Sequence, residues 1–198
     1  MTTYEEWRMA SLEPFQVNME TLYKQEVLVV GSIGRSAIHQ ALSGDAAREF
    51  TARGERWPLW QYTSLPRDID TLDPGENPYA MVRYRREHFV DSTAFNNMHV
   101  RFERHGARWR VTTNPGGKQE RALDVDAALL APWEGRAIYD TRCLTVRPAM
   151  HRILLSSRSP RDKDRIALRL LDEVMPEEDK ELLLSEPYVA LASLMSRV

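Results

Sequence analysis

Asp68 and Asp70 flank Ile69 in the segment RDID. Alternate residues of a strand project from the same side, so this spacing predicts two carboxylates on one strand face with Ile69 in the core. Two adjacent carboxylates repel each other unless a cation lies between them, and Mg²⁺ prefers carboxylate and phosphate oxygens. The segment therefore predicts a magnesium site able to stabilise the attacking and leaving oxygens of an in-line displacement at phosphorus.

We expect a neighbouring strand to supply a third carboxylate to such a site. The segment RALDVDAALL, residues 121–130, offers Asp124 and Asp126 on one strand face, with Leu123 and Val125 on the other. Spacing alone leaves both aspartates open as the third metal ligand.

The apolar run at 27–30 ends at Gly31 and Ser32, and apolar residues at helical spacing follow. A strand, a tight glycine turn and a helix N-terminus together form a phosphate site from backbone N–H groups. Ser36 stands where both the dinucleotide-binding fingerprint and the P-loop require a glycine, so neither motif is present. The turn therefore predicts phosphate binding of another kind.

Composition narrows the class of protein. The chain has 198 residues, of which 42% are hydrophobic and 28% charged, as in ordinary globular proteins. The single cysteine, Cys143, excludes an internal disulfide, and we expect it to be a small buried residue in a reduced, cytoplasmic setting. No apolar run reaches the ~20 residues of a membrane helix, so no membrane partner is expected.

A formal net charge of −2 argues against an overall polybasic protein. Residues 83–121 nevertheless hold nine basic and four acidic side chains, and this local excess indicates either an RNA-contacting face or a solvated sheet face. The five histidines show no metal-ligand spacing, which favours ordinary surface or core roles for them.

The elements that must position these residues divide the chain into a mixed α/β part and a helical part. Residues 98–113 form the clearest predicted hairpin, because apolar and charged residues alternate on both sides of a turn at His105–Gly106. The other predictions are short helices at 2–12 and 16–25, strands at 26–30, 67–72 and 122–132, and helices at 33–50, 148–157, 161–175 and 177–197.

Strand–Gly–Ser–helix, an Asp-x-Asp strand and a later strand aspartate together resemble the nucleotidyltransferase superfamily that includes DNA polymerase beta, over about residues 26–130. The tail RPAMHRILLSSRSPRDKDRIALRLL is similar to that of AbiEii-like nucleotidyltransferases, which include bacterial toxins paired with antitoxins, some adding nucleotides to tRNA. The resemblance implies an α+β fold. Its expected parts are a nucleotidyltransferase-like mixed β-sheet flanked by helices over 1–140, and a C-terminal helical region over 141–198.

The resemblance also implies roles for individual residues. Gly31 and Ser32 would hold the triphosphate of an NTP through backbone N–H groups and a hydroxyl. Asp68 and Asp70 would bind Mg²⁺. Asp124 is preferred as the third carboxylate, orienting or deprotonating the acceptor hydroxyl, because the family aspartate is usually followed by an apolar residue and further strand.

Further polar residues would face the nucleotide. Arg35, on the first turn of the predicted helix, would meet a β- or γ-phosphate oxygen. Arg152 stands near the position of a lysine that faces the nucleotide in AbiEii-like toxins, and Asp164 matches the acid of their Lys-Asp motif.

The activity implied is transfer of an NMP from an NTP to an acceptor hydroxyl. The acceptor would be tRNA, a small molecule such as an aminoglycoside, or a protein. An antitoxin would be the protein partner. The alternative is a non-catalytic member of the fold that binds a nucleotide for regulation.

Overall fold

The computed structural model describes residues 19–20, 22–44, 68–72, 81–85, 100–114, 116–136, 142–156 and 162–196. Over these ranges the protein is α+β. The strands are β1 (Leu28–Val30), β2 (Asp68–Leu72), β3 (Met81–Arg85), β4 (Val100–His105), β5 (Arg108–Thr113), β6 (Arg121–Asp126), β7 (Trp133–Arg136) and β8 (Arg142–Thr145). The helices are α2 (Gly31–Ser43), the 3₁₀ turn η2 (Ala127–Leu130), α5 (Pro148–Ser156), α6 (Asp162–Val174), α7 (Glu177–Leu183) and α8 (Glu186–Met195).

The strands form three small sheets, named here A (β1-β2-β3), B (β4-β5-β6) and C (β7-β8). Every pairing among the described strands is antiparallel. This differs from the single mixed sheet that we expected. It also places the strand that carries Asp68 and Asp70 in sheet A, and the strand that carries Asp124 in sheet B.

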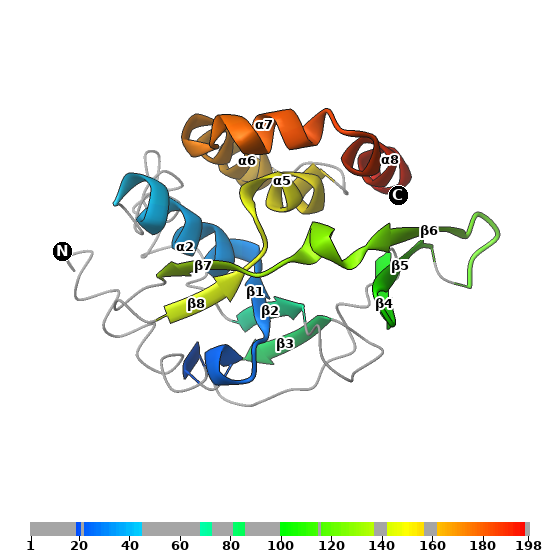
Figure 1. Cartoon of the computed structure of the whole chain (residues 1–198), viewed down its shortest axis with the longest axis horizontal. Helices are drawn as coiled ribbons and strands as arrows, with labels where there is room; N and C mark the ends of the chain where they lie inside the picture. The colour runs from blue at the N-terminus through cyan, green and yellow to red at the C-terminus, as the bar shows by residue number, and fades with distance from the viewer. Residues whose placement is uncertain are drawn as a thin grey trace.

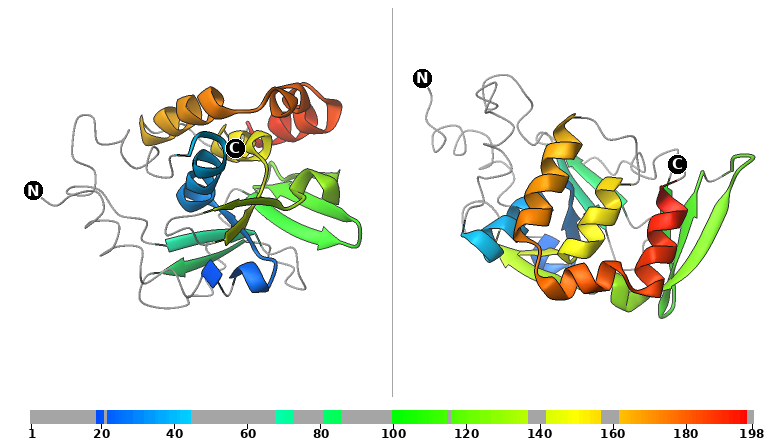
Figure 2. Two further views of the ribbon diagram at one scale, coloured as in Figure 1. Left: turned by 60° about the vertical axis from the view of Figure 1, so that its left-hand side comes forward. Right: turned by 90° about the horizontal axis from the view of Figure 1, so that it is seen from above.

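The helices α5 to α8 lie over one side of the strands (Figure 1), with α8 beside β6. Two further views show the same layer from the side and from above (Figure 2). Helix α2 is central, because it contacts strands of sheets A and C as well as α5 and α6. A Cβ atom on Gly135 of β7 would lie 3.0 Å from the carbonyl oxygen of Ala37 in α2, so small residues allow this close approach.

The main hydrophobic core joins both predicted regions of the chain, 1–140 and 141–198. Burying apolar area is the largest favourable term in folding, so residues that share one core are expected to fold together. The buried members come from sheets A and B, η2, the link between β8 and α5, α5 and α8: Leu28, Val30, Leu72, Phe102, Trp109, Val111, Val125, Leu129, Leu130, Val146, Ala149, Met150, Ile153, Tyr188, Leu191 and Met195.

The predicted hairpin is confirmed as β4 and β5. Phe102, Trp109 and Val111 are buried, whereas Arg108 and Arg110 between them are exposed. The hairpin turns at Gly106, whose φ of 62° is accessible to glycine at little cost. The helices predicted at 148–157 and 161–175 are confirmed as α5 and α6.

Three predicted element boundaries are wrong. The strand predicted at 122–132 ends at Asp126, whose carboxylate accepts a hydrogen bond from Ala128 N and begins η2. The helix predicted at 177–197 is two helices, because Ser185 is the N-cap of α8 and a proline follows at the helix start. The helix predicted to reach residue 50 ends at Ser43, where Gly44 takes a left-handed C-cap conformation.

Strands β3, β7 and β8 were not predicted. The expected helix at 2–12 lies outside the described residues. Among the helices that the structure describes, none combines the length and the apolar character needed to cross a membrane.

Candidate functional site

The turn between β1 and α2 forms the first part of the site. Val30 is the N-cap of α2 and makes no side-chain cap, and the next residue, Gly31, has φ 67°. The first N–H groups of a helix have no intrahelical acceptor, and the helix dipole makes this end positive. An anion is therefore the ligand that the first turn of α2, Gly31 and Ser32 included, is suited to bind.

Asp70 lies against this turn. The pairing of β1 with β2 sets Val30 opposite Asp70, and a Cβ atom on Gly31 would lie only 2.6 Å from Asp70 Oδ2. The site therefore requires glycine at position 31 for two reasons, the backbone conformation and the space that the carboxylate occupies. The structure thus brings together residues from two separate predicted motifs, the glycine turn and the Asp-x-Asp strand.

Asp68 precedes Asp70 by two positions in β2, where its backbone pairs with Arg85 of β3. Alternation along the strand places positions 68 and 70 on the same face. The structure describes only the backbone of Asp68, so its role as a magnesium ligand stays a prediction. A cation at this face would reduce the repulsion between Asp70 and an anion at the helix end.

Asp124 and Asp126 lie on the outer face of sheet B. Val125 between them is buried, while both aspartates are exposed, as the alternation predicted. An ion pair of 3.7 Å joins Asp124 Oδ1 to Arg110 Nη1, and both side chains are 49% exposed. Asp126 caps η2 instead. The role of Asp124 as the third carboxylate stays a prediction, since β6 and β2 belong to different sheets.

Arg35 is buried, with 6% of its surface exposed, and its contact with a phosphate oxygen stays a prediction. It belongs to a polar cluster between α2, β8 and α5 that also includes His39, Thr145 and His151, each no more than 1% exposed. Burial holds the pKa of His151 well below its usual value, and the positive charge of Arg35 and the nearby His39 lower it further. The His151 imidazole is therefore neutral at pH 7.

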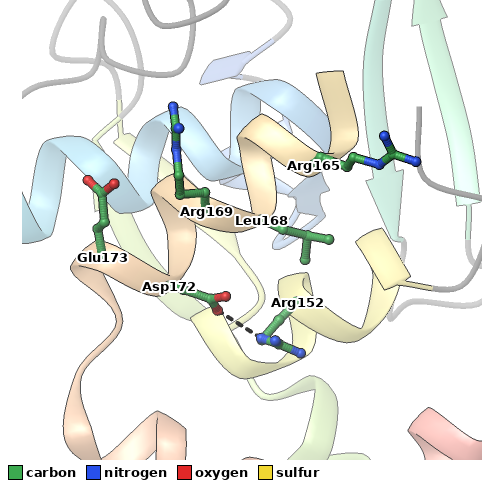
Figure 3. A pocket seen from close by; sticks show the side chains of 6 residues that line it. All are labelled: Arg152, Arg165, Leu168, Arg169, Asp172 and Glu173. Carbon is green, nitrogen blue, oxygen red and sulfur yellow. Dashed lines mark hydrogen bonds and ion pairs between the residues drawn. The ribbon is translucent and has the colours of Figure 1, made fainter. Parts of the chain in front are cut away.

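Arg152 lies at an open groove between α5 and α6 with a volume of about 610 Å³. Its Nε donates to Asp172 Oδ1 at 2.7 Å (Figure 3). Arg165 and Arg169 also line the groove, and Figure 3 shows their side chains extending in different directions from α6. The guanidinium groups do not converge on one point, and a nucleotide contact by Arg152 stays a prediction.

Asp164, the third residue of α6, is buried with 2% of its surface exposed. Asp164 thus lies in the interior of the fold, in a helix that contacts α2. A buried charge of this kind requires a polar or charged partner. Its predicted role toward a nucleotide is likewise not tested by this placement.

Cys143 is buried, and burial raises the pKa of its thiol to about 12, so it is a thiol at pH 7, as its predicted structural role requires. Within the described side chains, no group of three or more His, Cys, Asp or Glu residues is arranged to hold a metal ion. The side chain of Asp68 is outside that set.

Sequence reasoning missed Thr145 and His151 as members of the polar cluster. Thr145 belongs to no recognisable motif. His151 lies in the tail compared with AbiEii-like proteins but had no predicted role there, and the spacing of the histidines indicated no metal site. Only the proximity of α5 to the β1–α2 turn, which is a property of the folded chain, shows their position. Comparisons of the chain with protein families, with curated proteins and with solved structures found no match, and its function is therefore inferred from its own residues.

Proposed function

We propose that the protein is a Mg²⁺-dependent nucleotidyltransferase that moves an NMP from an NTP to an acceptor hydroxyl. The observation that carries the proposal is the close approach of the Asp70 carboxylate to Gly31, at the N-terminus of α2, where Val30 provides no side-chain cap. This pairing of an anion-binding helix end with a cation-binding side chain fits a magnesium–triphosphate ligand better than it fits a bare anion.

The chain's own residues would do three things in this reaction. The first turn of α2, with Gly31 and Ser32, would bind the triphosphate. Asp70 and Asp68 would hold Mg²⁺, which when bound neutralises charge on phosphate oxygens. The acceptor oxygen would form a bond to the α-phosphorus as the bond to the β-phosphate oxygen breaks, with pyrophosphate leaving and the hydroxyl proton passing to a carboxylate, Asp124 in the sequence prediction.

The acceptor that we favour is tRNA, and a role as the toxin of a toxin–antitoxin pair follows from the same resemblance. The exposed basic side chains that would contact RNA phosphates are Arg108 and Arg110 on the outer face of sheet B, where Asp124 and Asp126 lie opposite them, Lys118 in the turn after β5, and Arg121 at the start of β6. Phosphate contacts of this kind bind RNA without reading its sequence. An aminoglycoside-type acceptor would not need such a face.

The test is incubation with each α-labelled NTP, Mg²⁺ and, separately, total tRNA, cell protein and aminoglycosides. We expect label in the tRNA pool that requires Mg²⁺ and is lost in Asp70→Asn. Glu134→Gln is the matched control, since Glu134 is an exposed carboxylate that pairs with Arg142 across sheet C. This variant should transfer label as the wild type does.

The outcomes are distinct. Label in the aminoglycoside pool would retain the activity and change the acceptor. Stabilisation by Mg²⁺ and an NTP, without transfer to any acceptor, would identify a non-catalytic nucleotide-binding protein. Neither stabilisation nor transfer, or transfer that Asp70→Asn leaves unchanged, would overturn the proposal.

A further inference from the structure

The buried polar cluster contains a chain of two short hydrogen bonds that ends next to the Gly31 turn. Thr145 Oγ1 lies 2.5 Å from the carbonyl oxygen of Val29, two residues before Gly31. The same Oγ1 lies 2.7 Å from His151 Nε2. Thr145 is at the end of β8 and His151 is in α5, so the chain links sheet A to the C-terminal region.

The two distances determine which atom donates in each bond. A carbonyl oxygen only accepts, so the hydroxyl proton of Thr145 must lie toward Val29, because two oxygens 2.5 Å apart without a proton between them would repel. The hydroxyl has no second proton, and His151 Nε2 must therefore donate to it. The hydrogen-bond network thus assigns the neutral Nε2–H tautomer to His151.

Gly34 provides the space in which these groups meet. A Cβ atom at this position would clash with the Val29 carbonyl oxygen and would lie 2.8 Å from Thr145 Oγ1 and 3.0 Å from His151 Cε1. All three neighbours of the missing Cβ are thus members of the hydrogen-bonded chain. Helix α2 therefore approaches the Val29 carbonyl closely only because residue 34 lacks a side chain.

We propose that Thr145 and His151 are positioning residues for the phosphate-binding turn: the His151 N–H orients the Thr145 hydroxyl, which holds the Val29 carbonyl and, through it, the backbone of Gly31 and Ser32. The effect on nucleotidyl transfer rests on the proposed function, whereas the effect on the turn does not. Buried hydrogen-bond networks that are fully satisfied impose one geometry, which a helix end aimed at a phosphate requires.

The charged and titratable groups that surround His151 favour this neutral form. Arg35 and His39, both on α2, lower the pKa of His151, and burial contributes most. A second cation beside Arg35 in the interior would be costly, so the imidazole stays a neutral donor through its Nε2–H. The lowered pKa thus fixes the charge of His151 at pH 7, while the short distance to Thr145 fixes which ring nitrogen carries the proton.

The first experiment uses the unmodified protein. Long-range ¹H–¹⁵N correlation spectra of the histidine side chains should show His151 as the Nε2–H tautomer at pH 7. An Nδ1–H tautomer would overturn the proposal, because Nε2 would then have no proton to donate to Thr145. This measurement does not depend on any enzymatic activity.

The second experiment compares Thr145→Val with Thr145→Ser. Valine keeps the shape of the side chain and removes the hydroxyl, whereas serine keeps the hydroxyl. We expect Thr145→Val to shift the amide resonances of Gly31 and Ser32, and Thr145→Ser to leave them close to the wild-type positions. Equal shifts in both variants would contradict the positioning role, and so would the absence of a shift in Thr145→Val.

The same variants test the consequence for transfer. Misplacement of binding groups lowers rates steeply, so kcat/KM for the NTP should fall about 10-fold or more in Thr145→Val and be restored in Thr145→Ser. His151→Gln, which can offer an N–H donor, should retain more activity than His151→Leu. If the wild type transfers no label to any acceptor, the proposed function fails, while the resonance shifts of Gly31 and Ser32 still decide the positioning role.

Discussion

Asp70 occupies the space that a side chain at Gly31 would need, with Oδ2 at 2.6 Å from the position of a Cβ atom. The contact joins the start of α2 to β2, so substitutions of the two residues should have coupled and measurable effects on the free energy of unfolding. A glycine here differs from the other left-handed glycines of the described chain, Gly44, Gly106 and Gly116, which have nothing within 4 Å of a Cβ atom.

Gly31→Ala should therefore destabilise the protein more than Gly44→Ala. Both alanines bear the cost of a left-handed conformation, about 1–2 kcal/mol, while only the one at position 31 meets the Asp70 carboxylate. We expect a total cost of about 3 kcal/mol for Gly31→Ala, measured by urea unfolding. Combining it with Asp70→Ala should recover part of that cost. Equal destabilisation by the two glycine variants would show that the close contact is absent in solution.

The stability of the protein should fall as the pH is lowered below about 6.5, the ordinary pKa of histidine. His151 has a lowered pKa in the folded state, so in acid the unfolded chain binds a proton at this residue that the folded chain does not. This difference favours unfolding by up to ~1.4 kcal/mol per pH unit. Urea unfolding at several pH values measures how the free energy of unfolding changes with pH. His151→Gln should reduce the slope of that change below pH 6.5. His105→Gln, at an exposed position, is the control, and an unchanged slope in His151→Gln would contradict the burial of a neutral imidazole.

Asp124→Asn and Asp126→Asn decide between the two candidates for the third carboxylate. Asparagine at 126 still caps η2, and the exposed pair of Asp124 with Arg110 contributes less than about 1 kcal/mol, so both variants should remain folded. Loss of a general base lowers transfer about 100-fold or more, and we expect this for Asp124→Asn only. The label-transfer assay provides the comparison. A loss of transfer confined to Asp126→Asn would assign the third carboxylate to Asp126 instead. Full activity in both variants would show that neither aspartate of sheet B takes part in the reaction.

Asp179→Ala should be one of the most destabilising substitutions in the C-terminal region. Asp179 is 2% exposed, and its Oδ1 accepts from both Arg147 Nε at 3.1 Å and Ala149 N at 3.0 Å. Removing it leaves Arg147 and the first turn of α5 without this acceptor, at a cost of about 3 kcal/mol. Glu178→Gln, which alters the exposed partner of the same arginine, should cost less than about 1 kcal/mol. Thermal unfolding of the two variants side by side measures the difference in stability between them. Equal stabilities would show that Asp179 is hydrated in solution and does not form the buried bonds to Arg147 and Ala149.

Periodicity predicted those elements that present one apolar face to the core. Helix α6 and the β4–β5 hairpin were placed within a few residues, because their apolar positions repeat at 3.6 and 2 residues respectively. Strand β8 has only four residues, with Cys143 between an exposed arginine and a half-buried leucine, and carries too short a pattern to be distinguished from a loop. Predicted boundaries were wrong where a local hydrogen bond ended the element, as at Asp126, whose carboxylate begins η2.

The local parts of the site were predictable, and its long-range parts were not. Gly31 was expected at a strand–helix turn from its neighbours alone, and the structure places it there. Alternation predicts which face of a strand Asp124 occupies, but it does not specify the sheet that the strand joins. The contact of Thr145 with Val29 joins residues that no motif relates, so only the folded structure shows it.

The hydrogen bond between Thr145 and Val29 also determines when the start of α2 can reach its final structure during translation. Val29 emerges from the ribosome early, but its carbonyl gains the Thr145 donor only after another 116 residues have been added. Folding that proceeds during synthesis thus leaves the turn at Gly31 without this bond until strand β8 has been made. A nascent chain would consequently hold the backbone at the start of α2 in its final geometry only after Thr145 has left the ribosome.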